Sequence, residues 1–134
     1  MDRATTDFSR IRRLLALYCQ LMDDRRYDEW SQLFAPDGVW ALGGAEYRGP
    51  AEARAYMDRL LRDRPQRTVK HLCTNILIDL DGTAGRVSSD YAMLAREPET
   101  APWSVVAFGR YVDRVVRQGD GSGWQFAERR LVTA

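Results

Sequence analysis

RTVKHLCTNILIDL, residues 67–80, is the stretch that decides the fold, because here the spacing of apolar residues changes from helical to alternating. Before it, apolar residues recur every three or four positions, which is typical of helices that bury one face. After it, alternation continues through three more segments separated by turn-forming residues, which predicts antiparallel strands. Helices followed by strands indicate an α+β fold, a cone-shaped α+β barrel in which three N-terminal helices pack on a strongly curved, mostly antiparallel sheet. We expect the mouth of such a cone to hold one small apolar ligand.

The spacing of apolar and turn-forming residues also predicts the order of elements. A proline in the first turn favours a third helix that starts at Gly49-Pro50, and Thr6 or Asp7 can cap the first helix. The segment 36–38, Pro-Asp-Gly, is expected to end the second helix. Helices are predicted at 7–22, at 27–34 and from 49 onward, and strands at 39–42, 46–48, 67–80, 85–96, 103–117 and 124–132.

Length and charge describe one small domain, residues 1–134. The net charge of +1 provides no field that would attract nucleic acid or a membrane surface. No apolar run reaches membrane-spanning length, and the first residues lack the pattern of a signal peptide. Cys19 and Cys73 form no CxxC motif, so we expect two reduced, buried thiols in a cytoplasmic protein.

His71, the single histidine, and Asp23, at the end of the first helix, are the strongest candidates for chemistry. An imidazole held by a carboxylate is a proton acceptor near neutral pH. Alternation places His71, Cys73, Asn75 and Leu77 on one strand face, which we interpret as the cone lining. The opposite orientation of His71 remains open, because a β-bulge would reverse the alternation.

The other face of this strand is aliphatic and predicts a homodimer formed through the sheet. A solvated sheet face does not usually carry so many apolar side chains. The residues are Leu72, Ile76, Ile78 and Leu80, with Val106, Phe108 and Val112 as candidate neighbours.

Several phrases of the sequence, in this order, resemble the SnoaL-like branch of the nuclear transport factor 2-like superfamily. Together they span nearly the whole chain. They are Tyr18–Asp23, Asp28–Trp40, Tyr47–Pro50, His71–Asn75, Gly109–Asp113 and Gly123–Arg129.

This resemblance implies a catalytic dyad of Asp23 and His71, as in scytalone dehydratase, bile-acid dehydratases and hexachlorocyclohexane dehydrochlorinase. Tyr18 matches a tyrosine that some of these dehydratases direct at the substrate. Asp24 remains an alternative to Asp23, as Arg130 does to Arg129, and the second histidine of scytalone dehydratase has no counterpart. The substrate-binding residues expected are Trp40, Met57, Asn75, Tyr91, Phe108 and Arg129.

The expected activity is that of a lyase, isomerase or cyclase that needs no metal and no organic cofactor. Its substrate would be a small apolar metabolite, for example a polyketide-like or polycyclic one. Two alternatives remain open within the same fold. One is a non-catalytic ligand-binding or dimerising accessory module. The other is an epoxide hydrolase-like enzyme, to which Asp90 and Arg110 or Arg129 could contribute.

Overall fold

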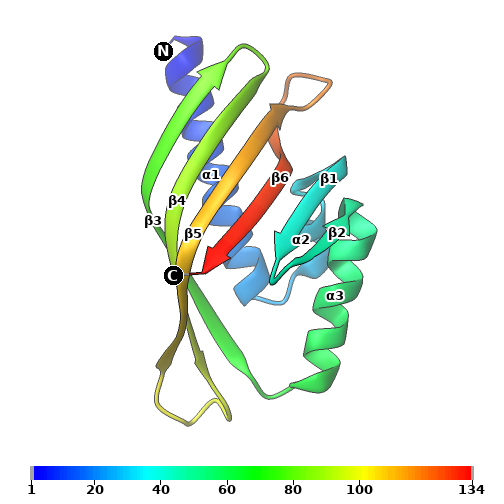
Figure 1. The fold of residues 1–134 in the computed structure, drawn as a ribbon, viewed down its shortest axis with the longest axis vertical. Helices are drawn as coiled ribbons and strands as arrows, with labels where there is room; N and C mark the ends of the chain where they lie inside the picture. Colours follow the sequence, from blue (N-terminus) through cyan, green and yellow to red (C-terminus); the bar gives the residue numbers. More distant parts are fainter. Residues whose placement is uncertain (1, 134) are drawn as a thin grey trace.

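The computed structural model describes residues 2–133, in which three helices pack against one face of a six-stranded sheet (Figure 1). Residues 1 and 134, included in the expected domain, lie outside the described part. The helices are α1 (Arg3–Asp23), α2 (Tyr27–Ser31) and α3 (Gly49–Asp63). The strands are β1 (Phe34–Leu42), β2 (Ala45–Arg48), β3 (Thr68–Asp81), β4 (Ala84–Arg96), β5 (Ser104–Arg117) and β6 (Trp124–Thr133).

The strand order in the sheet is β2-β1-β6-β5-β4-β3. β1 and β6 run parallel, and the other four neighbouring pairs are antiparallel. The predicted α+β class and mostly antiparallel sheet are therefore confirmed. The sheet does not close into a barrel, because β2 and β3 are its two outermost strands and do not pair with each other.

α1 begins earlier than predicted, and its cap is a different residue. Asp2 accepts a hydrogen bond from the backbone N–H of Thr5 at 2.9 Å, so the expectation that Thr6 or Asp7 caps the helix is wrong. Asp7 is instead buried, where Arg117 donates two hydrogen bonds to its carboxylate at 2.9 and 2.7 Å. These bonds from Arg117 lower the pKa of Asp7. Asp7 thereby ties α1 to β5, far from it in sequence.

The segment 36–38 does not end a helix, because α2 already stops at Ser31 and the segment lies inside β1. Its residues form an irregularity in the pairing of β1 with β6, between Phe34 and Val39. A Cβ atom on Gly38 would lie 2.7 Å from the carbonyl oxygen of Phe126, so only glycine allows β1 to approach β6 this closely.

A β-bulge in β3 determines which residues face the interior. Pairing with β4 shifts by one residue between Thr74 and Leu77, and Asn75 there has a positive φ of 54°. Before the bulge, His71 and Cys73 face inward. After it, inward positions pass from odd to even residue numbers.

Because of the bulge, the prediction that β3 has an aliphatic outer face is largely wrong. Ile76, Ile78 and Leu80 pack against the core. Only Leu72 remains outside, 52% exposed, and Leu77, expected inside, is 68% exposed. The outer face of the sheet nevertheless carries several exposed apolar residues beside charged ones such as Arg110, because strands β5 and β6 contribute to it. Its other exposed apolar residues include Val105, Val106, Phe108, Val112 and Val132.

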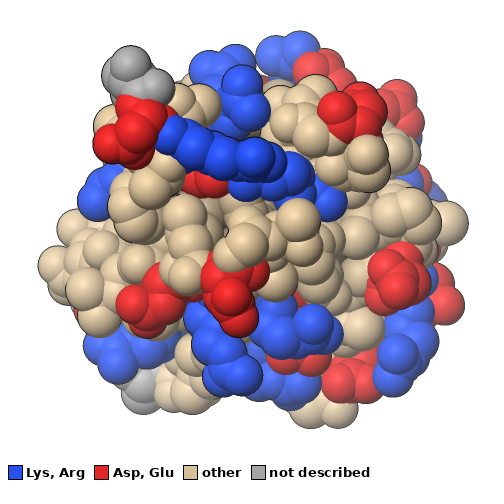
Figure 2. Space-filling model, turned by 90° about the horizontal axis from the view of Figure 1, so that it is seen from above, with Lys and Arg blue, Asp and Glu red and all other residues tan. Residues whose placement is uncertain are grey.

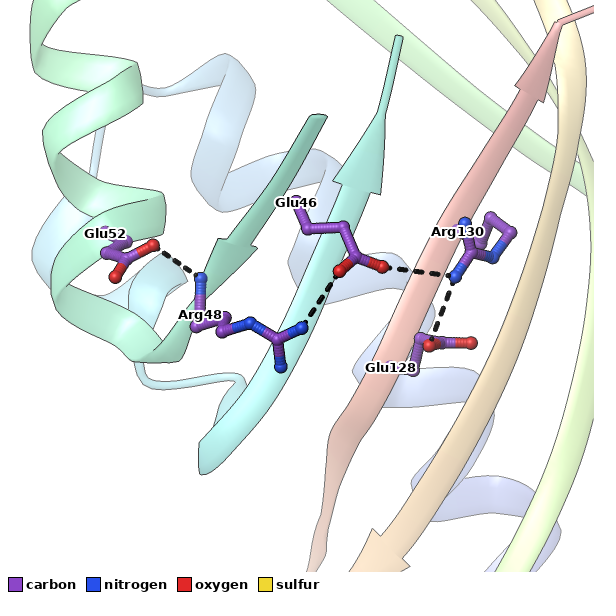
Figure 3. Close-up of polar contacts among 5 residues, drawn as sticks. All are labelled: Glu46, Arg48, Glu52, Glu128 and Arg130. Carbon is purple, nitrogen blue, oxygen red and sulfur yellow. Dashed lines mark hydrogen bonds and ion pairs between the residues drawn. The ribbon is translucent and has the colours of Figure 1, made fainter. Parts of the chain in front are cut away.

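At the other end of the sheet, the outer face is polar (Figure 3). Glu46 of β2 contacts both Arg48, at 3.0 Å, and Arg130 of β6, at 3.5 Å. Glu52 of α3 accepts a hydrogen bond from the backbone N–H of Arg48 at 2.9 Å. Exposed pairs of this kind contribute little to stability.

Charges of both signs alternate over the surface seen from above in Figure 2. This view agrees with the net charge of +1 and shows no extended region of one sign. Within residues 2–133, no helix has the length and apolar character needed to cross a membrane.

Candidate active site

A cavity of about 720 Å³ opens between the helices and the inner face of the sheet. This volume suits a ligand of small-metabolite size. Its walls come from α1, α3, β1, the start of β3 and the loop that follows β4. Both Asp23 and His71 line it.

The two candidate catalytic residues are in direct contact. Nδ1 of His71 lies 2.5 Å from Oδ1 of Asp23, and the backbone N–H of His71 donates to Oδ2 at 2.9 Å. The side chains are only 8% and 5% exposed. Because a carboxylate can only accept, Nδ1 carries the proton, and Nε2 is left as the acceptor of the neutral ring.

The end of α1 places Asp23 rather than Asp24 at the cavity. Asp23 is the last residue of the helix, while Asp24 is its exposed C-cap. The last turn of α1 has no basic residue, and a carboxylate near the negative end of a helix costs about 0.3–1 kcal/mol. The backbone N–H and the imidazole ring of His71 both contact this carboxylate and hold it in an otherwise unfavourable position.

Tyr18 lines the cavity one helical turn before Met22 and is almost wholly buried. Burial raises the pKa of its phenol well above the usual range, so the hydroxyl keeps its proton near neutral pH. The indole N–H of Trp40 donates to the Tyr18 oxygen at 3.1 Å. The phenolic proton of Tyr18 is therefore available for a ligand.

Trp40 and Met57 also line the cavity, as expected for substrate-binding residues. Tyr27 and Tyr56 line it as well and were not singled out from the sequence. Tyr56 packs edge-on against Trp40, with ring centres 5.4 Å apart. The two tyrosines occupy helical positions that look like ordinary core positions, so their spacing carries no signal of a ligand site.

Two expected lining residues lie on the outer face of the sheet. Asn75 sits in the bulge and donates to the carboxylate of Asp90 at 2.9 Å. Phe108 is 60% exposed, because inward positions of β5 are odd-numbered. Neither residue is among those that line the cavity.

Tyr91 is also not a lining residue, although it faces inward. It is buried and stacks on Tyr111, with ring centres 4.5 Å apart and planes 22° from parallel. Tyr91 therefore belongs to the core behind the cavity rather than to its surface.

Arg129 is wholly buried beneath the cavity, whereas Arg130 lies outside in the polar contacts of Figure 3. Nε and Nη2 of Arg129 donate to Asp113 at 3.0 and 3.3 Å. The guanidinium carbon lies 3.6 Å from the ring centre of Tyr111 and 4.2 Å from that of Tyr18. Arg129 thus packs beneath the aromatic rings of Tyr18 and Tyr111, and Tyr18 separates it from the cavity.

The two cysteines are free; Cys19 is buried, whereas Cys73, expected to be buried too, is only partly so. Burial raises the pKa of the Cys19 thiol to about 12. Cys19 is therefore an unreactive core thiol near neutral pH. Among residues 2–133, no three His, Cys, Asp or Glu side chains are grouped so that they could hold a metal ion.

The chain was compared with known protein families, curated sequences and solved structures. The family described as SnoaL-like domain matches residues 3–130. None of the curated protein sequences matches the chain.

Several solved structures share the fold. Rv3472 from Mycobacterium tuberculosis, a protein of unknown function solved as a single-substitution variant, is 27% identical with a TM-score of 0.86; the match covers 96% of this chain and 77% of that one. A Novosphingobium aromaticivorans protein named "Putative Scytalone Dehydratase" is 24% identical with a TM-score of 0.84, over 98% and 86% of the two chains. ActVI-ORFA from Streptomyces coelicolor is 15% identical with a TM-score of 0.84, over 96% of each chain.

Proposed function

Since the chain belongs to the SnoaL-like domain family, we propose that it is a cofactor-independent lyase, isomerase or cyclase. Its substrate is a small, largely apolar metabolite, polyketide-like or polycyclic, that carries a carbonyl group. The observation that carries this proposal is the contact of 2.5 Å between His71 and Asp23 at the wall of a cavity large enough for such a molecule.

In the proposed reaction, Nε2 of His71 removes a proton from a carbon next to the carbonyl, or from a hydroxyl that attacks within the same molecule. Asp23 holds the ring through Nδ1 and stabilises the imidazolium that forms. Tyr18 donates its phenolic proton in a hydrogen bond to the developing oxyanion or leaving oxygen. The apolar walls keep water away and strengthen these interactions.

The geometry supports this reaction better than the two alternatives. An epoxide hydrolase-like site would need Asp90 with Arg110 or Arg129, but Asp90 and Arg110 pair on the outer face and Arg129 is wholly buried. A binding module needs no hydrogen-bonded acid and base at its cavity. The Novosphingobium protein of the same fold is named for a dehydratase, which agrees with elimination chemistry.

Proton exchange tests the proposal without the natural substrate. Incubation of fused-ring ketones such as β-tetralone with the protein in D₂O should exchange the protons next to the carbonyl faster than buffer alone. Mass spectrometry measures the deuterium gained. Exchange at the rate of the buffer across a panel of cyclic ketones would favour the binding-module alternative.

Exchange should survive dialysis against a chelator, because the proposed reaction uses only the side chains of Asp23, His71 and Tyr18. The chain has a single histidine and, over residues 2–133, no group of three metal-ligating side chains. The measurement is the exchange rate before and after chelation. Loss of exchange that a divalent ion restores would contradict this mechanism.

We also propose that the chain forms a homodimer through the outer face of β3–β6. A second copy fits this face because its apolar residues surround the exposed pair Asp90–Arg110, whose atoms lie 2.7 Å apart. A twofold axis there would bring each Asp90 near the Arg110 of the other copy.

Light scattering at micromolar concentration should give twice the chain mass of 15.4 kDa. Phe108→Glu should shift the protein to monomer, because it would bury two carboxylates in the interface. Phe8→Glu is the matched control, since Phe8 is an exposed phenylalanine of α1, 38% accessible, outside the sheet. A monomeric wild-type protein would refute the dimer.

A further inference from the structure

Arg67 lies at the entrance of the cavity, on the same side of the chain as His71. Residue 67 directly precedes β3, and the cavity is lined continuously by residues 64–69 and then by His71. The exposed residues Pro65 and Gln66 before it also line the cavity, whereas His71 is nearly buried. Arg67 therefore lies at the outer end, and His71 at the inner end, of the cavity wall that the start of β3 forms.

Two other arginines at this entrance already have partners. Arg25 donates from Nη2 to the backbone oxygens of Pro65 and Arg67, at 3.0 and 2.8 Å. Arg64 donates to Glu97 at 3.2 Å. These bonds hold the segment before β3 in place against the end of α1 and the loop after β4.

Arg67, in contrast, makes no side-chain hydrogen bond and no ion pair with any residue of the described chain, 2–133. Its neighbour Arg64 adds a second positive charge, and Glu99 lines the same cavity without coming within ion-pair distance of Arg67. Burial and Arg64 lower the pKa of Arg67, and the carboxylate of Glu97 offsets this lowering only in part, so the positive charge of Arg67 is not fully compensated. An arginine in this position offers a planar set of donors to an anion.

We propose that Arg67 binds an anionic oxygen group of the ligand, a carboxylate or a phosphate monoester, while the apolar body of the ligand extends toward His71. The proposal rests on the proposed function, and it narrows the substrate class to acidic metabolites with an apolar ring system. Arg67 and His71 are four steps apart along extended backbone, so their Cα atoms are about 13 Å apart. A fused-ring body with a short acidic side chain spans this distance.

Binding of matched probes tests the subsite without any turnover. Titration calorimetry would compare naphthylpropionate, its uncharged primary amide and naphthylethyl phosphate. Wild-type protein should bind one or both of the anions about tenfold or more tightly than the amide, because a charged hydrogen bond is worth about 1.5–3 kcal/mol. A preference for only the propionate or only the phosphate identifies which of the two groups the site takes.

Arg67→Gln should remove this preference and leave the affinity for the amide unchanged. Arg62→Gln, at an exposed arginine of α3 that does not line the cavity, is the control and should keep the preference. Arg67→Lys keeps the positive charge and should retain part of the preference for the anions. Wild-type protein that binds neither anion better than the amide, or Arg67→Gln that keeps the preference, would overturn the proposal. Because binding is measured, the subsite can stand or fall independently of proton exchange.

Discussion

His71→Gln is expected to lower the rate of proton exchange, and of turnover once a substrate is identified, by about a hundred- to ten-thousand-fold. Glutamine keeps a donor for Asp23 but has no basic nitrogen, so the reaction loses its proton acceptor. The fold should lose little, because the backbone N–H of His71 still donates to Asp23. Exchange rates and urea denaturation of the same preparation separate the two effects.

Asp23→Asn should cost a similar factor, because the amide cannot stabilise the imidazolium as a carboxylate does. The double variant should be little slower than the worse single variant, since the two residues act as one unit. Asp24→Asn, at the exposed C-cap, is the matched control and should be active. Nearly full activity of His71→Gln would show that His71 is structural, and effects that multiply would show that the residues act independently.

Arg129→Met is expected to lower the free energy of unfolding by about 3–5 kcal/mol, because it leaves the carboxylate of Asp113 buried without its partner. Both side chains are completely inaccessible to solvent. Burial raises the pKa of Asp113 even beside Arg129, which shows how poorly this site tolerates a lone charge. Urea denaturation followed by tryptophan fluorescence measures the loss.

Two further variants make the origin of this loss clear. Arg130→Met, on the neighbouring exposed residue of β6, should change stability by about 0.5 kcal/mol or less. Arg129→Met combined with Asp113→Leu should recover part of the stability, because it removes both buried charges. A loss below about 1 kcal/mol in Arg129→Met would mean that the ion pair contributes little.

Most of the fold could be predicted from the sequence, because the spacing of apolar residues reports which side of each element is buried. The change of period at Arg67 locates the start of the long strands, and β3 begins at Thr68, one residue later. The position of the β3 bulge could not be predicted, since Asn75 adopts a positive φ that many asparagines do not adopt. Because of the bulge at Asn75, Ile76 rather than Leu77 faces the interior, and Asn75 itself does not line the cavity.

The candidate site was predicted only in part, for a similar reason. Asp23, His71, Tyr18, Trp40 and Met57 lie on regular stretches, where spacing determines direction, and all of them line the cavity. Arg129 was expected at the surface of the cavity, and its burial depends on Asp113, a partner on another strand. The entrance was not predicted, because an arginine just before a strand resembles an ordinary exposed residue and the lining there, residues 64–69, follows no period.

The hydrogen bond from the backbone of His71 to Asp23 also has a consequence for solubility. β3 is an edge strand, and the backbone N–H groups on its free side can recruit a strand from another molecule. The carboxylate of Asp23 occupies one of these groups, and α1 lies along the strand. Asp23, which we propose holds the catalytic base, thus also protects this edge against intermolecular β-pairing. Replacing Asp23 with alanine would expose this edge and favour aggregation, whereas asparagine would still cover it.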